Sequence, residues 1–148
     1  MKQTKLGSTF HVGLKHQQDG RICQDFSIAV QDGPITILAL SDGMGSYKYA
    51  ELGAQFVVNF IRENAKIIHD LLESAFIKDE NEDLSWKKTE KETFIKKIIG
   101  RMQSEAQDYA ARIGAGIDDL HCTLSFAIIG PTHMIAASKG RKYDRYDI

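Results

Sequence analysis

The spacing of apolar positions divides the first part of the chain into two strand-like runs. Residues 26–31 alternate loosely between apolar and polar side chains, and residues 35–40 are a short apolar run rich in β-branched residues. Between them stands Asp32-Gly33-Pro34, a typical turn sequence. Two strands joined by so short a turn predict an antiparallel hairpin.

A helical period replaces the strand pattern after residue 46. Leu52, Phe56 and Phe60 lie four positions apart, and Ile68 and Leu72 continue the same stripe. Residues this far apart share one face of an α-helix, so the pattern predicts an amphipathic helix that extends to about residue 76.

A second helix is predicted after a polar stretch. Residues 78–91 lose the apolar stripe, which predicts a solvated loop. Phe94, Ile98 and Met102 then restore the four-residue spacing, and the pattern predicts a helix that ends near residues 114–116.

Two more strands complete the pattern. Residues 122–129 and 133–137 are apolar runs separated by the turn sequence Gly130-Pro131-Thr132. The predicted order is therefore ββααββ, and the hairpins indicate an α+β fold rather than a doubly wound parallel sheet. Residues 138–148 show no core periodicity. We expect one domain over residues 1–137 and an irregular tail.

Composition narrows the class of protein without defining its function. The 148 residues are 43% hydrophobic and 26% charged, as in an ordinary globular domain, and the net charge is −1. This balance argues against a broad nucleic-acid or anionic-membrane surface. No apolar run approaches the roughly 20 residues that span a bilayer. The polar start lacks a signal-peptide core, so a cytoplasmic location is expected.

The densest candidate for chemistry is Ser41-Asp42-Gly43, where the second predicted strand ends. An acidic residue there places a carboxylate at the rim of the sheet, and Gly43 lets the backbone turn its carbonyl toward the same point. Such oxygen donors suit a hard divalent cation, Mg²⁺ or Mn²⁺. An ordinary turn with a helix cap explains the same residues equally well.

A second carboxylate favours the metal site. Asp25 directly precedes the first predicted strand. If the two strands pair as a hairpin, Asp25 and Asp42 fall at the same open end. Two converging carboxylates repel each other unless a cation or a proton lies between them. We therefore predict that these two residues lie close together.

Three motifs together resemble one enzyme family. Residues 13–25, with a His, a Gly and a final Cys-Gln-Asp, resemble the N-terminal signature of PPM/PP2C-type metal-dependent serine/threonine phosphatases, in the bacterial branch with that tripeptide. Residues 41–46 resemble the second motif of the family. Residues 121–124 are similar to its Thr-Thr-Leu element, with Cys122 replacing the first Thr. The resemblance covers roughly residues 6–137.

The resemblance implies a fold and a reaction. The fold would be an α-β-β-α sandwich, and the activity would be hydrolysis of phosphoserine or phosphothreonine in proteins by water activated on Mn²⁺ or Mg²⁺. Asp42 would bridge two metal ions as the central catalytic residue, and Gly43 would offer its carbonyl. Asp25 would join the metal site directly or through water.

Two residues upstream of the metal motif match the family less closely. His16 corresponds to the histidine of the bacterial branch and would contact phosphate or donate a proton, although a merely hydrogen-bonded histidine fits as well. Arg21 lies one position from the family's phosphate-binding arginine, so its role is open.

The second half of the family's ligand set has no counterpart here. The family takes further aspartates from a Gly-Asp turn, but Lys139-Gly140-Arg141 stands in that place, and Asp144 and Asp147 match no motif. The sequence resembles the truncated first half of a phosphatase, with an incomplete sandwich and weak metal binding. A catalytically impaired pseudophosphatase that acts as a binding or regulatory module is the alternative. Half a sandwich exposes one face of its sheet, so a homodimer or aggregation is also expected.

Overall fold

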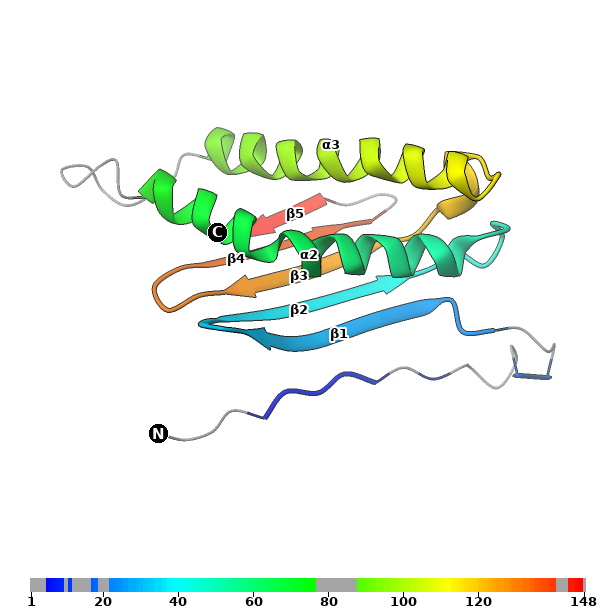
Figure 1. The fold of residues 1–148 in the computed structure, drawn as a ribbon, viewed down its shortest axis with the longest axis horizontal. Helices are drawn as coiled ribbons and strands as arrows, with labels where there is room; N and C mark the ends of the chain where they lie inside the picture. Colours follow the sequence, from blue (N-terminus) through cyan, green and yellow to red (C-terminus); the bar gives the residue numbers. More distant parts are fainter. Residues whose placement is uncertain are drawn as a thin grey trace.

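Within the part of the chain that the structure describes, five antiparallel strands and two long helices make up the fold (Figure 1). The computed structural model describes residues 5–9, 11, 17–18, 22–76, 88–140 and 144–147. In chain order the elements are β1 (Asp25–Asp32), β2 (Ile35–Asp42), α2 (Ala50–Phe76), α3 (Lys88–Arg112), the 3₁₀ helix η1 (Ile117–Leu120), β3 (Leu124–Ile129), β4 (Met134–Lys139) and β5 (Asp144–Asp147). The sheet has the order β1-β2-β3-β4-β5, so each strand pairs with its neighbour in sequence.

The α+β class, both hairpins and both helices are as the sequence predicts. Two predictions, the extent of the solvated loop and the irregular tail, were wrong. The predicted solvated loop extended to residue 91, but α3 begins at Lys88, and Trp86 with the rest of that loop lies outside the described residues. The tail was expected to be irregular, but β4 extends to Lys139 and residues 144–147 form β5. An edge strand needs only main-chain pairing, which β4 supplies, so it shows no core periodicity.

The hydrophobic core lies between the two helices and one face of the sheet (Figure 1). Along β2 the buried positions alternate with exposed or half-buried ones, as a strand with one covered face requires. The fully buried members of the core come from both helices and three strands: Ile37, Val58, Ile61, Ala65, Leu72, Ile95, Ile128 and Ile135. The described residues thus form one helix layer and one sheet layer.

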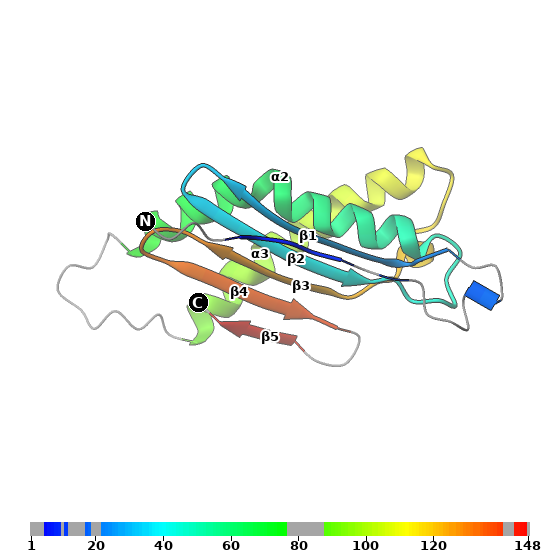
Figure 2. The same cartoon turned by 90° about the horizontal axis from the view of Figure 1, so that it is seen from below.

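No helix among the described elements lies over the other face of the sheet, called here the open face (Figure 2). Its central side chains are small or aliphatic and uncharged: Ser27, Ala29, Leu38, Leu40, Ser125, Ala127, Ala136 and Ser138. Residues 7–9 line a hollow of about 560 Å³ on this face, and the Ser8 hydroxyl donates a hydrogen bond of 3.3 Å to the carbonyl of Ser27. Leu40 nevertheless keeps 53% of its surface exposed.

No helix among the described residues is both long enough and apolar enough to cross a membrane.

Candidate metal centre

The hairpin register brings the two predicted carboxylates together. Asp25 of β1 pairs directly with Asp42 of β2. The amide of Gly43 donates a 3.0 Å hydrogen bond to the carbonyl of Gln24, so the Gln24/Gly43 pair is the hydrogen-bonded one. Hydrogen-bonded and non-hydrogen-bonded pairs alternate in antiparallel sheets. Asp25 and Asp42 therefore form a non-hydrogen-bonded pair, in which the Cα atoms are only about 4.5 Å apart and the side chains lie on one face.

The two carboxylates lie at the rim of the open face. Asp42 is exposed and follows Leu38 and Leu40 in the alternation of β2, while Asp25 is half-buried. Two like charges directly opposite each other destabilise a strand pair, and a divalent cation between them removes that cost. Carboxylate oxygens are also the ligands that Mg²⁺ and Mn²⁺ prefer. The residues present here fit such an ion.

The backbone of Asp42 is held by Thr123, which directly precedes β3. The amide of Thr123 donates to the Asp42 carbonyl at 2.9 Å, and the Asp42 amide donates to the Thr123 hydroxyl oxygen at 3.0 Å. The buried hydroxyl of Ser41 donates to the Thr123 carbonyl. These bonds fix the end of β2 from which the Asp42 carboxylate projects, which makes Thr123 a positioning residue.

Gly43 is required by the close approach of three segments. A Cβ atom at this position would lie 2.6 Å from the Gln24 carbonyl oxygen and 2.7 Å from that of Ala50. Gly43 forms an isolated antiparallel bridge with Cys122. In this bridge the Met44 amide donates to the His121 carbonyl, and the Thr123 amide donates to the Asp42 carbonyl. In such a bridge the amide and carbonyl of Gly43 itself point away from Cys122, toward β1, on the side of Gln24 and Asp25.

His16 and Arg21 lie outside the described residues. Asp25, Asp42 and Gly43 thus come together at one end of the sheet. The predicted proton donor and the predicted phosphate-binding residue are not among the residues that define this site.

The Cys122 thiol borders the same region but is not suited to nucleophilic chemistry. Burial raises the pKa of Cys122 above its ordinary value, with the Asp42 charge acting in the same direction and a hydrogen bond with Ser41 opposing it. The thiol is therefore protonated near neutral pH, whereas a cysteine nucleophile needs the thiolate.

A second group of potential ligands lies at the opposite end of the sheet. On α2, His69 Nε2 is 3.8 Å from a Glu73 oxygen, and His69 Nδ1 is 3.9 Å from an Asp70 oxygen. His69 Nε2 is buried and has no hydrogen-bond partner among the residues that the structure describes, and the ring packs against Gly130 in the β3–β4 turn. That turn is at the end of β3 remote from Asp42, so the two groups cannot share an ion.

The His69 group was not predicted from the sequence. Its available signal was the i, i+4 spacing of His69 and Glu73 on the predicted helix, since residues so spaced lie side by side. One ligand atom from each of His69, Asp70 and Glu73 lies within 4.8 Å of the others, so this group is a second candidate metal site.

Comparison with known proteins gives the family. The sequence profile of the family described as protein phosphatase 2C matches residues 12–140, most of the chain. The chain therefore belongs to the protein phosphatase 2C family. No match is found among curated proteins.

A solved structure supports the fold. The serine/threonine phosphatase Stp1 from Staphylococcus aureus has 18% sequence identity and a TM-score of 0.51; the match covers 99% of this chain and 56% of that protein. A bacterial serine phosphatase has 15% identity and a TM-score of 0.43, over 83% of this chain and 47% of its own. The chain thus spans about half the length of the solved structures that it matches.

Thr123 provides a test of how the Asp42 backbone is held. Thr123→Val keeps the shape but removes the oxygen that accepts the Asp42 amide, so we expect a loss of about 1 kcal/mol in the free energy of unfolding. Thr123→Ser retains the acceptor and is expected to lose less. Urea denaturation compares the two. Equal losses in both variants would contradict a role for the hydroxyl.

Proposed function

We propose that the chain is the metal-binding part of a phosphatase that hydrolyses phosphoserine or phosphothreonine in proteins. The observation that carries the proposal is the directly opposed pair of Asp25 and Asp42, at the end of a sheet in a member of the protein phosphatase 2C family. The phosphoprotein substrate is inferred from the family, and the metal site from the two carboxylates.

In this proposal each residue has one task. Asp42 and Asp25 hold Mn²⁺ or Mg²⁺ through carboxylate oxygens, and the Gly43 carbonyl is a further ligand on the β1 side. Thr123 keeps the Asp42 backbone in place through its two hydrogen bonds. When bound, the ion supplies activation of water at neutral pH and neutralisation of phosphoryl charge. His16 is proposed as a phosphate contact or proton donor and Arg21 as a phosphate-binding residue.

The expected activity is low. An octahedral ion takes about six oxygen ligands, and the described residues place two carboxylates at this end of the sheet, so most ligands must come from water or from elsewhere. We therefore propose that this chain binds the ion weakly and turns over slowly.

The test is a Mn²⁺-dependent assay with para-nitrophenyl phosphate and with a phosphothreonine peptide. We expect slow hydrolysis that requires Mn²⁺ and disappears in Asp42→Asn, while Asp70→Asn at the other end of the sheet retains it. Turnover that survives Asp42→Asn would overturn the site assignment.

The alternative is a pseudophosphatase that binds without hydrolysis. It is favoured by the small number of ligands, since the described residues place two carboxylates at this end of the sheet and an octahedral ion takes about six oxygen ligands. A protein that binds the phosphopeptide in the presence of Mn²⁺, yet hydrolyses neither substrate, would support this alternative.

We also propose that the open face packs against a second copy of the chain. An uncharged sheet face with aliphatic side chains gains from burial, and two twisted sheets pack face to face at about 10 Å. A cytoplasmic location is proposed as well, and cell fractionation tests it.

Light scattering after gel filtration tests the dimer. We expect twice the monomer mass for the chain and the monomer mass for Ala127→Glu, since Ala127 pairs with Leu38 and Ala136 at the centre of the open face. Ile67→Glu is the matched control, because Ile67 is an exposed apolar residue of α2 on the helix side. A monomeric wild-type chain would contradict the proposal.

A further inference from the structure

The imidazole of His69 on α2 is buried among groups that it does not hydrogen-bond. Only 6% of its side chain is exposed, and Nε2 has no hydrogen-bond partner within the described part of the chain. A Glu73 oxygen lies 3.8 Å from Nε2, and an Asp70 oxygen lies 3.9 Å from Nδ1. Both distances are too long for a hydrogen bond, and a buried polar group without a partner costs free energy. The ring therefore lacks the partner that its burial calls for.

The same distances fit ligands that share one ion. Bonds of about 2 Å from zinc to nitrogen and to oxygen place two ligand atoms up to about 4 Å apart. One ligand atom from each of His69, Asp70 and Glu73 already lies within 4.8 Å of the others. The two acidic side chains are 61% and 38% exposed, so they can turn toward an ion, and they leave it a path from solvent.

The surroundings of the group leave its negative charges to a cation. Among the described residues, His69 is the only basic side chain within ion-pair distance of Asp70 or Glu73. Thr132 of the β3–β4 turn donates a hydrogen bond of 3.4 Å to Glu73 Oε1, and such a contact orients a metal ligand. Gly130 of the same turn packs on the ring, where a Cβ atom would lie 1.8 Å from Nε2. An ion therefore enters from the exposed side of the two carboxylates.

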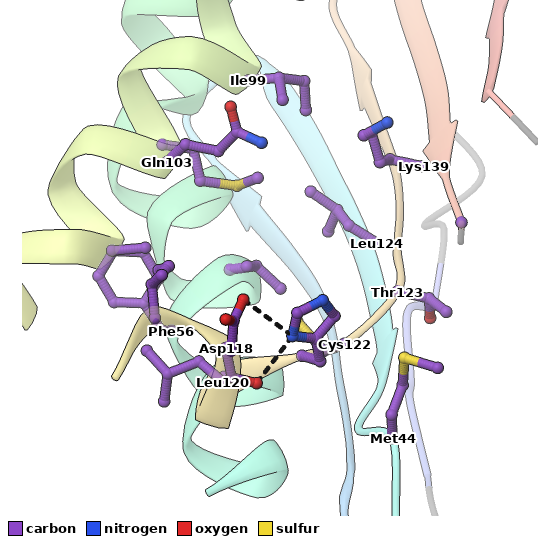
Figure 3. Close-up of a pocket in the computed structure, with 17 residues that line it drawn as sticks. Met44, Phe56, Ile99, Gln103, Asp118, Leu120, Cys122, Thr123, Leu124 and Lys139 are labelled. Carbon is purple, nitrogen blue, oxygen red and sulfur yellow. Dashed lines mark hydrogen bonds and ion pairs between the residues drawn. The ribbon is translucent and has the colours of Figure 1, made fainter. Parts of the chain in front are cut away.

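His121, at the other end of the sheet, shows the contrasting case of a histidine with a partner. Its Nδ1 lies 2.7 Å from the Asp118 carbonyl oxygen and 4.0 Å from the Asp118 carboxylate, the two contacts drawn as dashed lines in Figure 3. Its ring also stacks on Tyr47, with the ring centroids 4.4 Å apart. A hydrogen bond already occupies this ring nitrogen, whereas His69 has no such bond in the described structure.

We propose that His69, Asp70 and Glu73 bind a zinc ion where α2 meets the β3–β4 turn, with water in the remaining coordination position. One imidazole nitrogen and two carboxylate oxygens form a set that suits Zn²⁺, and sites with nitrogen ligands bind Zn²⁺ more tightly than Mn²⁺. The ion fixes the ring that packs on Gly130, so it stabilises the contact between the helix and the turn. This site is independent of the proposed phosphatase activity.

Calorimetry with Asp42→Asn tests the zinc site apart from the carboxylate pair of Asp25 and Asp42. We expect this variant to bind one Zn²⁺ ion per chain and no detectable Mn²⁺. Zn²⁺ should also raise its unfolding temperature, because an ion that binds only the native state stabilises that state. A variant that binds no Zn²⁺ would overturn the proposal.

Three further substitutions in the same background locate the ion. Asp70→Asn and Glu73→Gln each remove one charged ligand and keep its shape. Each should weaken Zn²⁺ binding by at least about tenfold, the usual cost of losing even a partner that only orients a ligand. Glu63→Gln is the matched control, since Glu63 is an exposed acidic residue of α2 outside the group, and it should leave the affinity unchanged. Equal Zn²⁺ affinity in all three variants would show that the ion binds elsewhere.

Nuclear magnetic resonance of the histidine rings tests direct coordination. In Asp42→Asn, Zn²⁺ should shift the ring nitrogen resonances of His69 and leave those of His121 unchanged, because His121 lies at the opposite end of the sheet. In Asp42→Asn combined with Asp70→Asn, the same Zn²⁺ concentration should shift the His69 resonances less. Zn²⁺ binding that leaves the His69 ring unchanged would overturn coordination by this imidazole.

Discussion

Gly53→Ala is expected to lower the free energy of unfolding by about 3 kcal/mol. A Cβ atom on Gly53 would lie 2.0 Å from the Leu120 carbonyl oxygen and 2.8 Å from its carbon. Both are backbone atoms, so the clash cannot be relieved by turning a side chain. The start of α2 and η1 would have to separate, although Leu120 is part of the buried interior. Urea denaturation measures the loss.

Gly100→Ala is the matched control. Gly100 lies inside α3, and nothing stands within 4 Å of the Cβ position. Alanine has the higher helix propensity, so this variant should be more stable by about 0.5–1 kcal/mol. If Gly53→Ala were stabilised to the same extent, the close packing of α2 against η1 would be wrong.

Asp42→Asn is expected to abolish Mn²⁺ binding measured by calorimetry. In the parent protein, Mn²⁺ should raise the unfolding temperature, because a ligand that binds only the native state stabilises it. The variant should lose that rise. Without metal it should be at least as stable as the parent, since the substitution removes the like charge opposite Asp25.

Asp70→Asn separates the two candidate sites. Asp70 belongs to the His69 group, at the other end of the sheet, and its removal should leave Mn²⁺ binding unchanged. Mn²⁺ binding that survives Asp42→Asn but not Asp70→Asn would assign the ion to the His69 group instead.

The carboxylate pair could be predicted because it depends on local sequence. The turn at Asp32-Gly33-Pro34 sets the register of one hairpin, and the register alone places Asp25 opposite Asp42. The helices were predictable for a similar reason, since their apolar stripes repeat within a single segment.

The features that the sequence did not reveal depend on distant pairing. Thr123 holds Asp42 from 81 positions away, and no local pattern marks that contact. β5 forms by pairing with β4, without an apolar pattern of its own. The spacing of His69 and Glu73 can be seen in the sequence. On an amphipathic helix, however, that spacing is as typical of an ordinary polar surface as of a pair of metal ligands.

The pairing of β2 with β3 also has a kinetic consequence. The hairpin of β1 and β2 closes a short loop. In contrast, β2 pairs with β3 only after the long segment that contains both helices has folded back onto the sheet. Closure of a long loop costs more entropy and slows folding. In refolding, the two carboxylates should thus meet early, and the Thr123 bonds that immobilise Asp42 should form late. High affinity for an ion should consequently develop in the last folding phase, and a peptide of residues 22–45 should bind Mn²⁺ more weakly than the whole chain.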